Sequence, residues 1–157
     1  MQVRLDEIVI DSPKVPQSLA MEEFQKWLDY KKTKVKLTMT GSDVEPADNK
    51  ADNKAEMAIV ESIMAGDLVI NEDMTMDYKL SFPIKNDSGS VELSSLSLKP
   101  RLTAFEVQKA TKGINTDEPF KLFTGYIHVL SGEVRGIINK LDSLDFSLLQ
   151  KIVGYFL

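Results

Sequence analysis

The last forty residues of the chain, 118–157, repeat apolar residues at helical spacing. Three successive segments repeat apolar residues at the spacing i, i+3, i+4, i+7, which places each set on one face of an α-helix. The three sets are Phe123, Tyr126, Ile127 and Leu130; Val134, Ile137, Ile138 and Leu141; and Leu149, Ile152, Val153 and Phe156. Because the connections between them are short, we predict three helices that bury these faces against one another.

An alternation with a period of two marks the middle of the chain. Every second residue over 76–84 is apolar, namely Met76, Tyr78, Leu80, Phe82 and Ile84. This pattern predicts a strand with one buried face. Apolar runs at 68–70 and 91–98 flank it across polar turns. We therefore predict an antiparallel sheet over 68–98, with the segments 1–10 and 35–40 as candidate additional strands.

Three further helices are indicated by apolar faces and capping residues. One spans about 19–32 and carries Trp27, which we interpret as an anchor onto the core. A second spans 55–65. A third begins where Thr103 and Glu106 have the spacing of a capping box. Together the patterns predict an α+β fold, with a small, mostly antiparallel sheet and a C-terminal cluster of three to four helices.

The distribution of charge and polarity suggests two parts. Residues 1–75 carry 15 acidic and 9 basic side chains, a net charge of −6, whereas residues 76–157 carry 9 and 10, a net charge of +1. The motif ADNK occurs twice in a polar stretch, which predicts a flexible loop at about 41–54. We therefore predict an N-terminal extension or subdomain over 1–75 and a second domain over 76–157.

Composition excludes several classes of function. A net charge of −5 argues against nucleic acid as the main partner, because phosphate binding depends on Lys and Arg. The absence of cysteine excludes disulfides, a thiolate nucleophile and cysteine-based zinc sites. No run of eighteen apolar residues predicts a membrane span, and charged residues interrupt the N-terminal apolar segment, unlike a signal peptide. We expect a soluble, intracellular protein.

Candidate catalytic residues are few. His128 is the single histidine, and we interpret it as a packed or surface residue of a helix. Asp142 and Asp145 lie three residues apart at the start of the last helix, where capping accounts for both, and a metal would need more oxygen ligands. An enzyme would need a pocket that perturbs His128 or Asp145. We therefore predict no enzymatic activity, no catalytic residue, no cofactor and no metal site.

Two stretches of the second half resemble the phage tail assembly chaperones, small proteins encoded beside the tape measure protein. The first stretch consists of SFPI, a turn, VELSSLSL and KPRLTAFEVQKATKG; the second is HVLSGEVRGIINKLDSLDFSLLQKIVGYFL. The closing pattern of the family falls on Leu130, Gly132, Ile137, Leu141, Asp142, Asp145, Phe146, Leu149, Val153 and Phe156. The resemblance covers about residues 76–157.

That resemblance implies a non-enzymatic protein of the bacterial host cytoplasm. It implies binding to the tape measure protein during tail assembly and help in bringing tail tube subunits to it, without retention in the finished particle. The alternative is a structural tail adaptor or completion protein that stays in the virion. Whether the chain forms a homo-oligomer stays open.

A partner surface is expected where apolar side chains exceed what three short helices need for their own core. These residues are Phe120, Phe123, Tyr126, Tyr155, Phe156 and Leu157. Either they remain exposed for a partner helix or a second subunit, or they belong to the core.

Overall fold

The computed structural model of the chain describes residues 14–31, 46–115 and 117–157, except the side chains of 46–53. In chain order its elements are α2 (Gln17–Lys31), α3 (Pro46–Ala65), β1 (Leu68–Ile70), β2 (Met76–Lys85), β3 (Val91–Leu98), α4 (Ala104–Thr111), α5 (Pro119–Ser131), α6 (Arg135–Ile138) and α7 (Ser143–Val153). The predicted α+β class is confirmed. The candidate strands at 1–10 and 35–40 lie outside the described residues.

The described strands form one antiparallel sheet in the order β1-β2-β3. Along β2 every second side chain is buried as predicted, except Phe82, which is 52% exposed. Pairing explains the exception. Lys79 lies opposite Ser95 and Ile84 opposite Leu93, so β2 advances five residues where β3 advances two. The bulge turns Phe82 away from the buried face.

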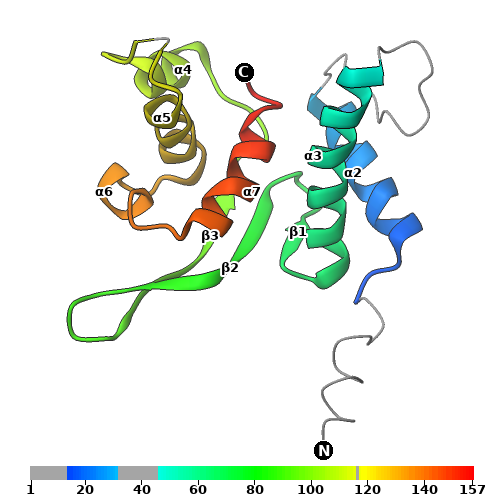
Figure 1. The fold of residues 1–157 in the computed structure, drawn as a ribbon, viewed down its shortest axis with the longest axis horizontal. Helices are drawn as coiled ribbons and strands as arrows, with labels where there is room; N and C mark the ends of the chain where they lie inside the picture. Colours follow the sequence, from blue (N-terminus) through cyan, green and yellow to red (C-terminus); the bar gives the residue numbers. More distant parts are fainter. Residues whose placement is uncertain (1–13, 32–45, 116) are drawn as a thin grey trace, which may run out of the picture.

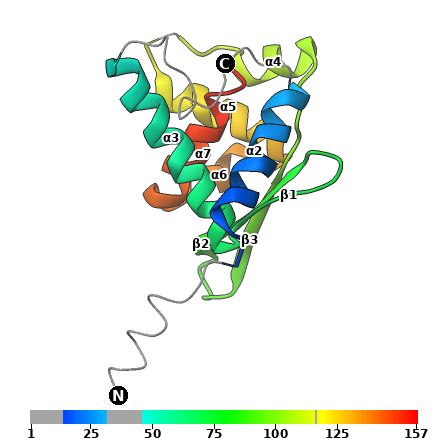
Figure 2. The same ribbon diagram turned by 90° about the vertical axis from the view of Figure 1, so that its right-hand side faces the viewer.

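Helices pack around this sheet from both ends of the chain. In Figure 1, α7 lies between the pair α2 and α3 on one side and the group α4, α5 and α6 on the other. Figure 2 shows α2 and α3 side by side in front of α7. Buried residues of all these parts belong to a single hydrophobic cluster.

The structure therefore differs from the predicted division into 1–75 and 76–157. That boundary falls inside a β-hairpin, because Leu68 of β1 pairs with Tyr78 of β2. Across the same boundary, the ring of Phe24 on α2 meets that of Tyr155 edge to face at 5.6 Å. The described part of the N-terminal half contributes to the same core as the C-terminal half.

The predicted loop at 41–54 also differs from the structure. Helix α3 begins at Pro46, so the backbone of 46–54 is helical, whereas 41–45 lies outside the described residues. Proline is favoured in the first helical turn, and the alanines that follow it in the sequence are the best helix formers. Polar composition alone therefore did not predict the helical backbone of this segment.

The C-terminal region contains the three predicted helical segments in unequal lengths. Helix α5 has 13 residues and α7 has 11, but α6 is a single turn of 4 residues. Ile152 is fully buried, while Phe123 and Ile137 are partly buried and pack against the same cluster. The three faces thus meet the sheet and the N-terminal helices as well as one another.

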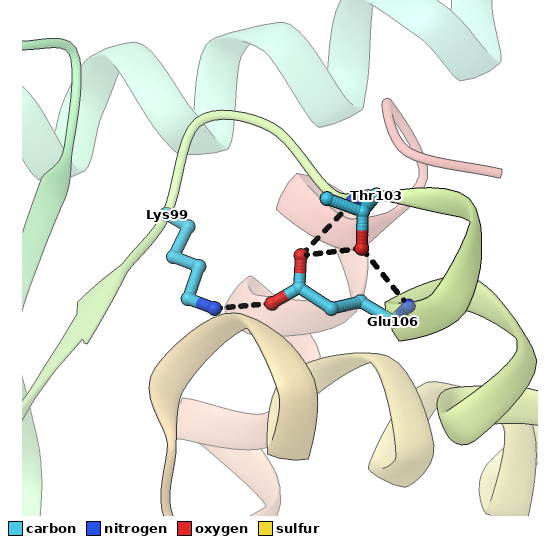
Figure 3. Close-up of polar contacts among 3 residues, drawn as sticks. All are labelled: Lys99, Thr103 and Glu106. Carbon is cyan, nitrogen blue, oxygen red and sulfur yellow. Dashed lines mark hydrogen bonds and ion pairs between the residues drawn. The ribbon is translucent and has the colours of Figure 1, made fainter.

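The predicted capping box is present at the start of α4. The Glu106 amide donates to Thr103 Oγ1 at 3.2 Å, and the Thr103 amide donates to Glu106 Oε1 at 2.9 Å. Figure 3 shows Lys99, from the end of β3, reaching the other carboxylate oxygen of Glu106. The bond from Lys99, followed by that from the Thr103 amide, lowers the pKa of Glu106. The box therefore connects the sheet to α4.

Replacing Thr103 with alanine is expected to lower the free energy of unfolding by about 1 kcal/mol, because an orphan amide of α4 loses its acceptor. Urea unfolding followed by circular dichroism measures this. Thr111→Ala is the matched control, because its hydroxyl donates only to carbonyls of its own helix. Equal stability of the Thr103 and Thr111 variants would contradict a role for the cap.

Candidate functional site

An open groove of about 300 Å³ lies between α3 and α7, with β2 as its floor. Both walls present residues at the spacing i, i+3, i+4, i+7 of one helical face. Helix α3 contributes Ala58, Glu61, Ser62 and Ala65; α7 contributes Leu144, Ser147, Leu148 and Lys151. Asp67, Tyr78 and Ser81 complete the lining.

The two walls differ in size and charge. The α3 wall has the small side chains of Ala58, Ser62 and Ala65 and the acidic Glu61, and the acidic Asp67 follows just after the end of the helix. The α7 wall offers Leu144, which is 60% exposed, and Lys151, whose ammonium donates to Ser147 at 3.0 Å. An amphipathic helix of another chain suits such a groove, because its apolar face can cover Leu144 while its charged residues meet the walls.

Asp145 holds the α7 wall to the floor. Its side chain is completely buried and accepts three hydrogen bonds: from the Tyr78 hydroxyl at 2.6 Å, the Ser81 amide at 2.9 Å and the Phe82 amide at 3.0 Å. Both amides lie in the bulge of β2, where the pairing with β3 shifts. The carboxylate thus replaces the acceptors that the bulge removes.

This arrangement corrects the interpretation of Asp145 as a helix cap. The cap is Asp142 alone, which accepts the Leu144 amide at 2.9 Å. Burial, and then the hydrogen bond to Asp145, raise the pKa of Tyr78. The Tyr78 hydroxyl therefore keeps its proton and remains a donor to Asp145. The cluster is a structural connection between α7 and β2.

Four of the six predicted partner-binding residues are engaged in the fold. Tyr126 is only 6% exposed, so of the two alternatives it takes the second and belongs to the core. Phe123 is half-buried against the core. Tyr155 packs edge to face on Trp27 at 6.0 Å, and Phe156 contacts the same indole at 5.9 Å. These contacts support the interpretation of Trp27, 1% exposed, as an anchor.

Lys31 closes this aromatic cluster at the end of α2. Its ammonium lies 3.3 Å from the ring centroid of Phe156 and donates to the Pro100 carbonyl at 3.2 Å. Burial, and then repulsion by Arg101, lower the pKa of Lys31 to about 8. Cation–π contact and the carbonyl account for a partly buried ammonium here.

Phe120 and Leu157 are the two predicted residues that remain open, at 67% and 60% exposure. Phe120 stacks on Phe146, with ring centroids 5.9 Å apart, and lines a shallow depression with Ile114 and Arg135. The six residues do not form one surface, because Tyr126 is buried and Tyr155 and Phe156 face α2.

His128 is half-buried, and its Nδ1 lies 2.7 Å from the Glu133 carbonyl, where it fixes the turn after α5. Within the described ranges no group of three or more His, Asp or Glu side chains is arranged to hold a metal ion. In the same part of the chain, no helix is both long and apolar enough to cross a bilayer.

The sequence interpretation missed Leu144 and Leu148 of the groove. The sequence could have indicated them, because their i, i+4 spacing places both on one side of a helix, apart from the predicted face with Leu149, Ile152 and Val153. Helix α7 therefore has a second apolar strip.

Neither a protein-family model, nor a curated protein, nor a solved structure matches the chain.

Proposed function

We propose that the protein acts by binding and not by catalysis, and that the groove between α3 and α7 receives an amphipathic helix of another protein. The observation that carries the proposal is the exposed Leu144 on a groove bounded by two helical faces. A helix laid between them would bury Leu144 and Leu148 and complete a local three-helix arrangement.

Charge on the walls defines the partner further. Glu61 and Asp67 make no ion pair with any other described residue, and Lys151 is bonded only to a serine hydroxyl. A partner helix with Lys or Arg on the side facing α3 and Glu or Asp on the side facing α7 would match both walls. Such matching contributes mainly to orientation and to the rate of association.

The resemblance of residues 76–157 to phage tail assembly chaperones suggests which helix this is. A tape measure protein is a long helical chain whose apolar faces need cover until tail tube subunits surround it. We propose that the chain gives that cover in the bacterial cytoplasm and helps recruit the tube subunits. A tail adaptor retained in the virion is the alternative, and detection of the chain in purified particles would favour it.

The test is calorimetric titration of the protein with helical fragments of the tape measure protein encoded in the same genome. Wild-type protein is expected to bind one of them, and Leu144→Glu to weaken binding at least about tenfold, because a carboxylate is then buried against apolar surface. Phe105→Glu is the matched control, because Phe105 lies on α4 and is 73% exposed. Its affinity should equal that of the wild type.

Two results would overturn the proposal. Absence of binding to every tape measure fragment would remove the assigned partner. Binding by Leu144→Glu at wild-type affinity, with loss in Phe120→Glu, would move the partner site to the start of α5. Unfolding curves for each variant separate loss of binding from loss of fold.

A further inference from the structure

The outer edge of β3 has main-chain groups without a hydrogen-bond partner in the described part of the chain. The Lys79 amide donates to the Asp67 carbonyl at 2.7 Å, on the β1 side of β2. In an antiparallel pair the amide and carbonyl of one residue point to the same side. Ser95, which lies opposite Lys79, therefore directs its amide and carbonyl away from β2.

The same geometry recurs two residues further along the strand. Ser97 also points its main chain outward, and after it the Lys99 amide leaves the sheet to reach the Leu130 carbonyl at 3.0 Å. The C-terminal end of α5 therefore occupies this edge at Lys99. The outward groups of Ser95 and Ser97 bond to no described residue, and both serines are exposed.

This edge lacks the usual protection against pairing. Natural edge strands carry lysine, proline or a bulge that blocks another strand. Over 93–98 the sequence LSSLSL has no charged residue and no proline; the large bulge lies on β2, and the one extra residue of β3, Glu92, comes before this stretch. The charges that flank this stretch are both paired: Glu92 with Lys140 at 3.3 Å, and Lys99 with Glu106. Figure 1 shows the hairpin of β2 and β3 reaching away from the helices.

We propose that the outer edge of β3 pairs with the same edge of a second copy of this chain, antiparallel and about a two-fold axis beside Leu96. Ser95 of each copy then lies opposite Ser97 of the other, so four hydrogen bonds form between two amides and two carbonyls of each strand. Leu96 is 2% exposed, so its side chain points to the buried face of the sheet and not to the face that carries Ser95 and Ser97.

Charge favours a second copy as the occupant. Residues 76–157 have a net charge of +1, from 9 acidic and 10 basic side chains, whereas residues 1–75 carry −6. The stretch 93–98 itself carries no charge, so two copies of this acidic chain meet there without like-charge repulsion. The short serine side chains also place no like charges opposite each other across the axis.

Proline substitution at Ser97 tests the pairing selectively. Ser97→Pro removes an amide that faces outward, so the ladder with β2 stays intact while an intermolecular bond is lost. Sedimentation of the wild type is expected to show a concentration-dependent species of twice the 17.6 kDa chain mass. Ser97→Pro and Ser95→Lys should each weaken association at least about tenfold, and Ser97→Ala, which keeps the amide, should not.

Amide hydrogen exchange gives a second readout that does not depend on any variant. The Ser95 and Ser97 amides should exchange slowly in concentrated protein and rapidly after dilution, whereas the Tyr78 amide, inside the sheet, should be protected in both. A wild-type chain that stays monomeric up to about 1 mM would overturn the proposal. So would a dimer that persists unchanged in Ser97→Pro and Ser95→Lys.

Discussion

Replacing Asp145 with alanine is expected to lower the free energy of unfolding by about 3–5 kcal/mol, because one buried and two partly buried donors lose their common acceptor and the cavity of a fully buried carboxylate is left behind. The donors are the Tyr78 hydroxyl and the amides of Ser81 and Phe82, all within 3.0 Å of the carboxylate. The two amides lie in a bulge of β2, so no carbonyl of β3 can replace the carboxylate as their acceptor. Urea unfolding, monitored by tryptophan fluorescence and circular dichroism, measures the loss.

Two further variants separate the contributions to this effect. Tyr78→Phe removes one donor and should cost about 1 kcal/mol. Asp142→Asn is the matched control, because it removes a carboxylate from the same helix start but keeps a capping oxygen, and it should change stability by about 0.5 kcal/mol or less. If Asp145→Ala and Asp142→Asn were equally stable, the carboxylate would act only through the helix dipole and not through the bulge.

Features that depend on neighbours in the sequence were the predictable ones. The period-two alternation over 76–84 gives β2, because successive side chains of a strand point to opposite faces whatever surrounds it. The capping box at Thr103 and Glu106 likewise needs only one helical turn. Gly132, which lies between the first two apolar sets of the C-terminal region, has φ 80° at the C-cap of α5, where glycine is the favoured residue.

Features that depend on competition between signals were predicted less well. The polar composition of 46–54 led to the prediction of a loop, although the alanines of this segment favour a helix. The backbone there is helical. The opposite error occurred at α6, where Ile137 and Leu141 fit a helical stripe but only 4 residues are helical. Gly136 in that turn raises the entropic cost of extending the helix.

The candidate site depends on contacts between distant parts of the chain. Asp145 and Tyr78 are 67 residues apart, so the sequence gives no sign that they are in contact. From its neighbours alone, Asp145 is an acidic residue at the start of a helix. The groove likewise needs α3 beside α7, and α3 belongs to the part that the charge distribution separated from the rest. Leu144 and Leu148 had a readable spacing, but only the packing shows that Leu144 is exposed and that Leu148, which is partly buried, lines the groove beside it.

Replacing Gly125 with alanine is expected to lower the free energy of unfolding by about 3 kcal/mol, and Tm by on the order of 10 °C, because α4 and α5 cross there without space for a methyl group. A Cβ atom at Gly125 would lie 2.0 Å from the Ala110 carbonyl oxygen, and that oxygen belongs to the backbone of α4. Neither helix can relieve this contact by rotating a side chain. The higher helix propensity of alanine offsets only about 1 kcal/mol.

Gly136→Ala is the matched control for the Gly125 variant. Gly136 lies in α6, and a Cβ atom there would meet no atom within 4 Å. Its replacement should leave stability unchanged or raise it slightly, through the same gain in helix propensity. Differential scanning calorimetry of both variants compares the two sites directly. Equal Tm values would mean that α4 moves away from α5 at little cost, and that the close crossing at Gly125 does not stabilise the fold.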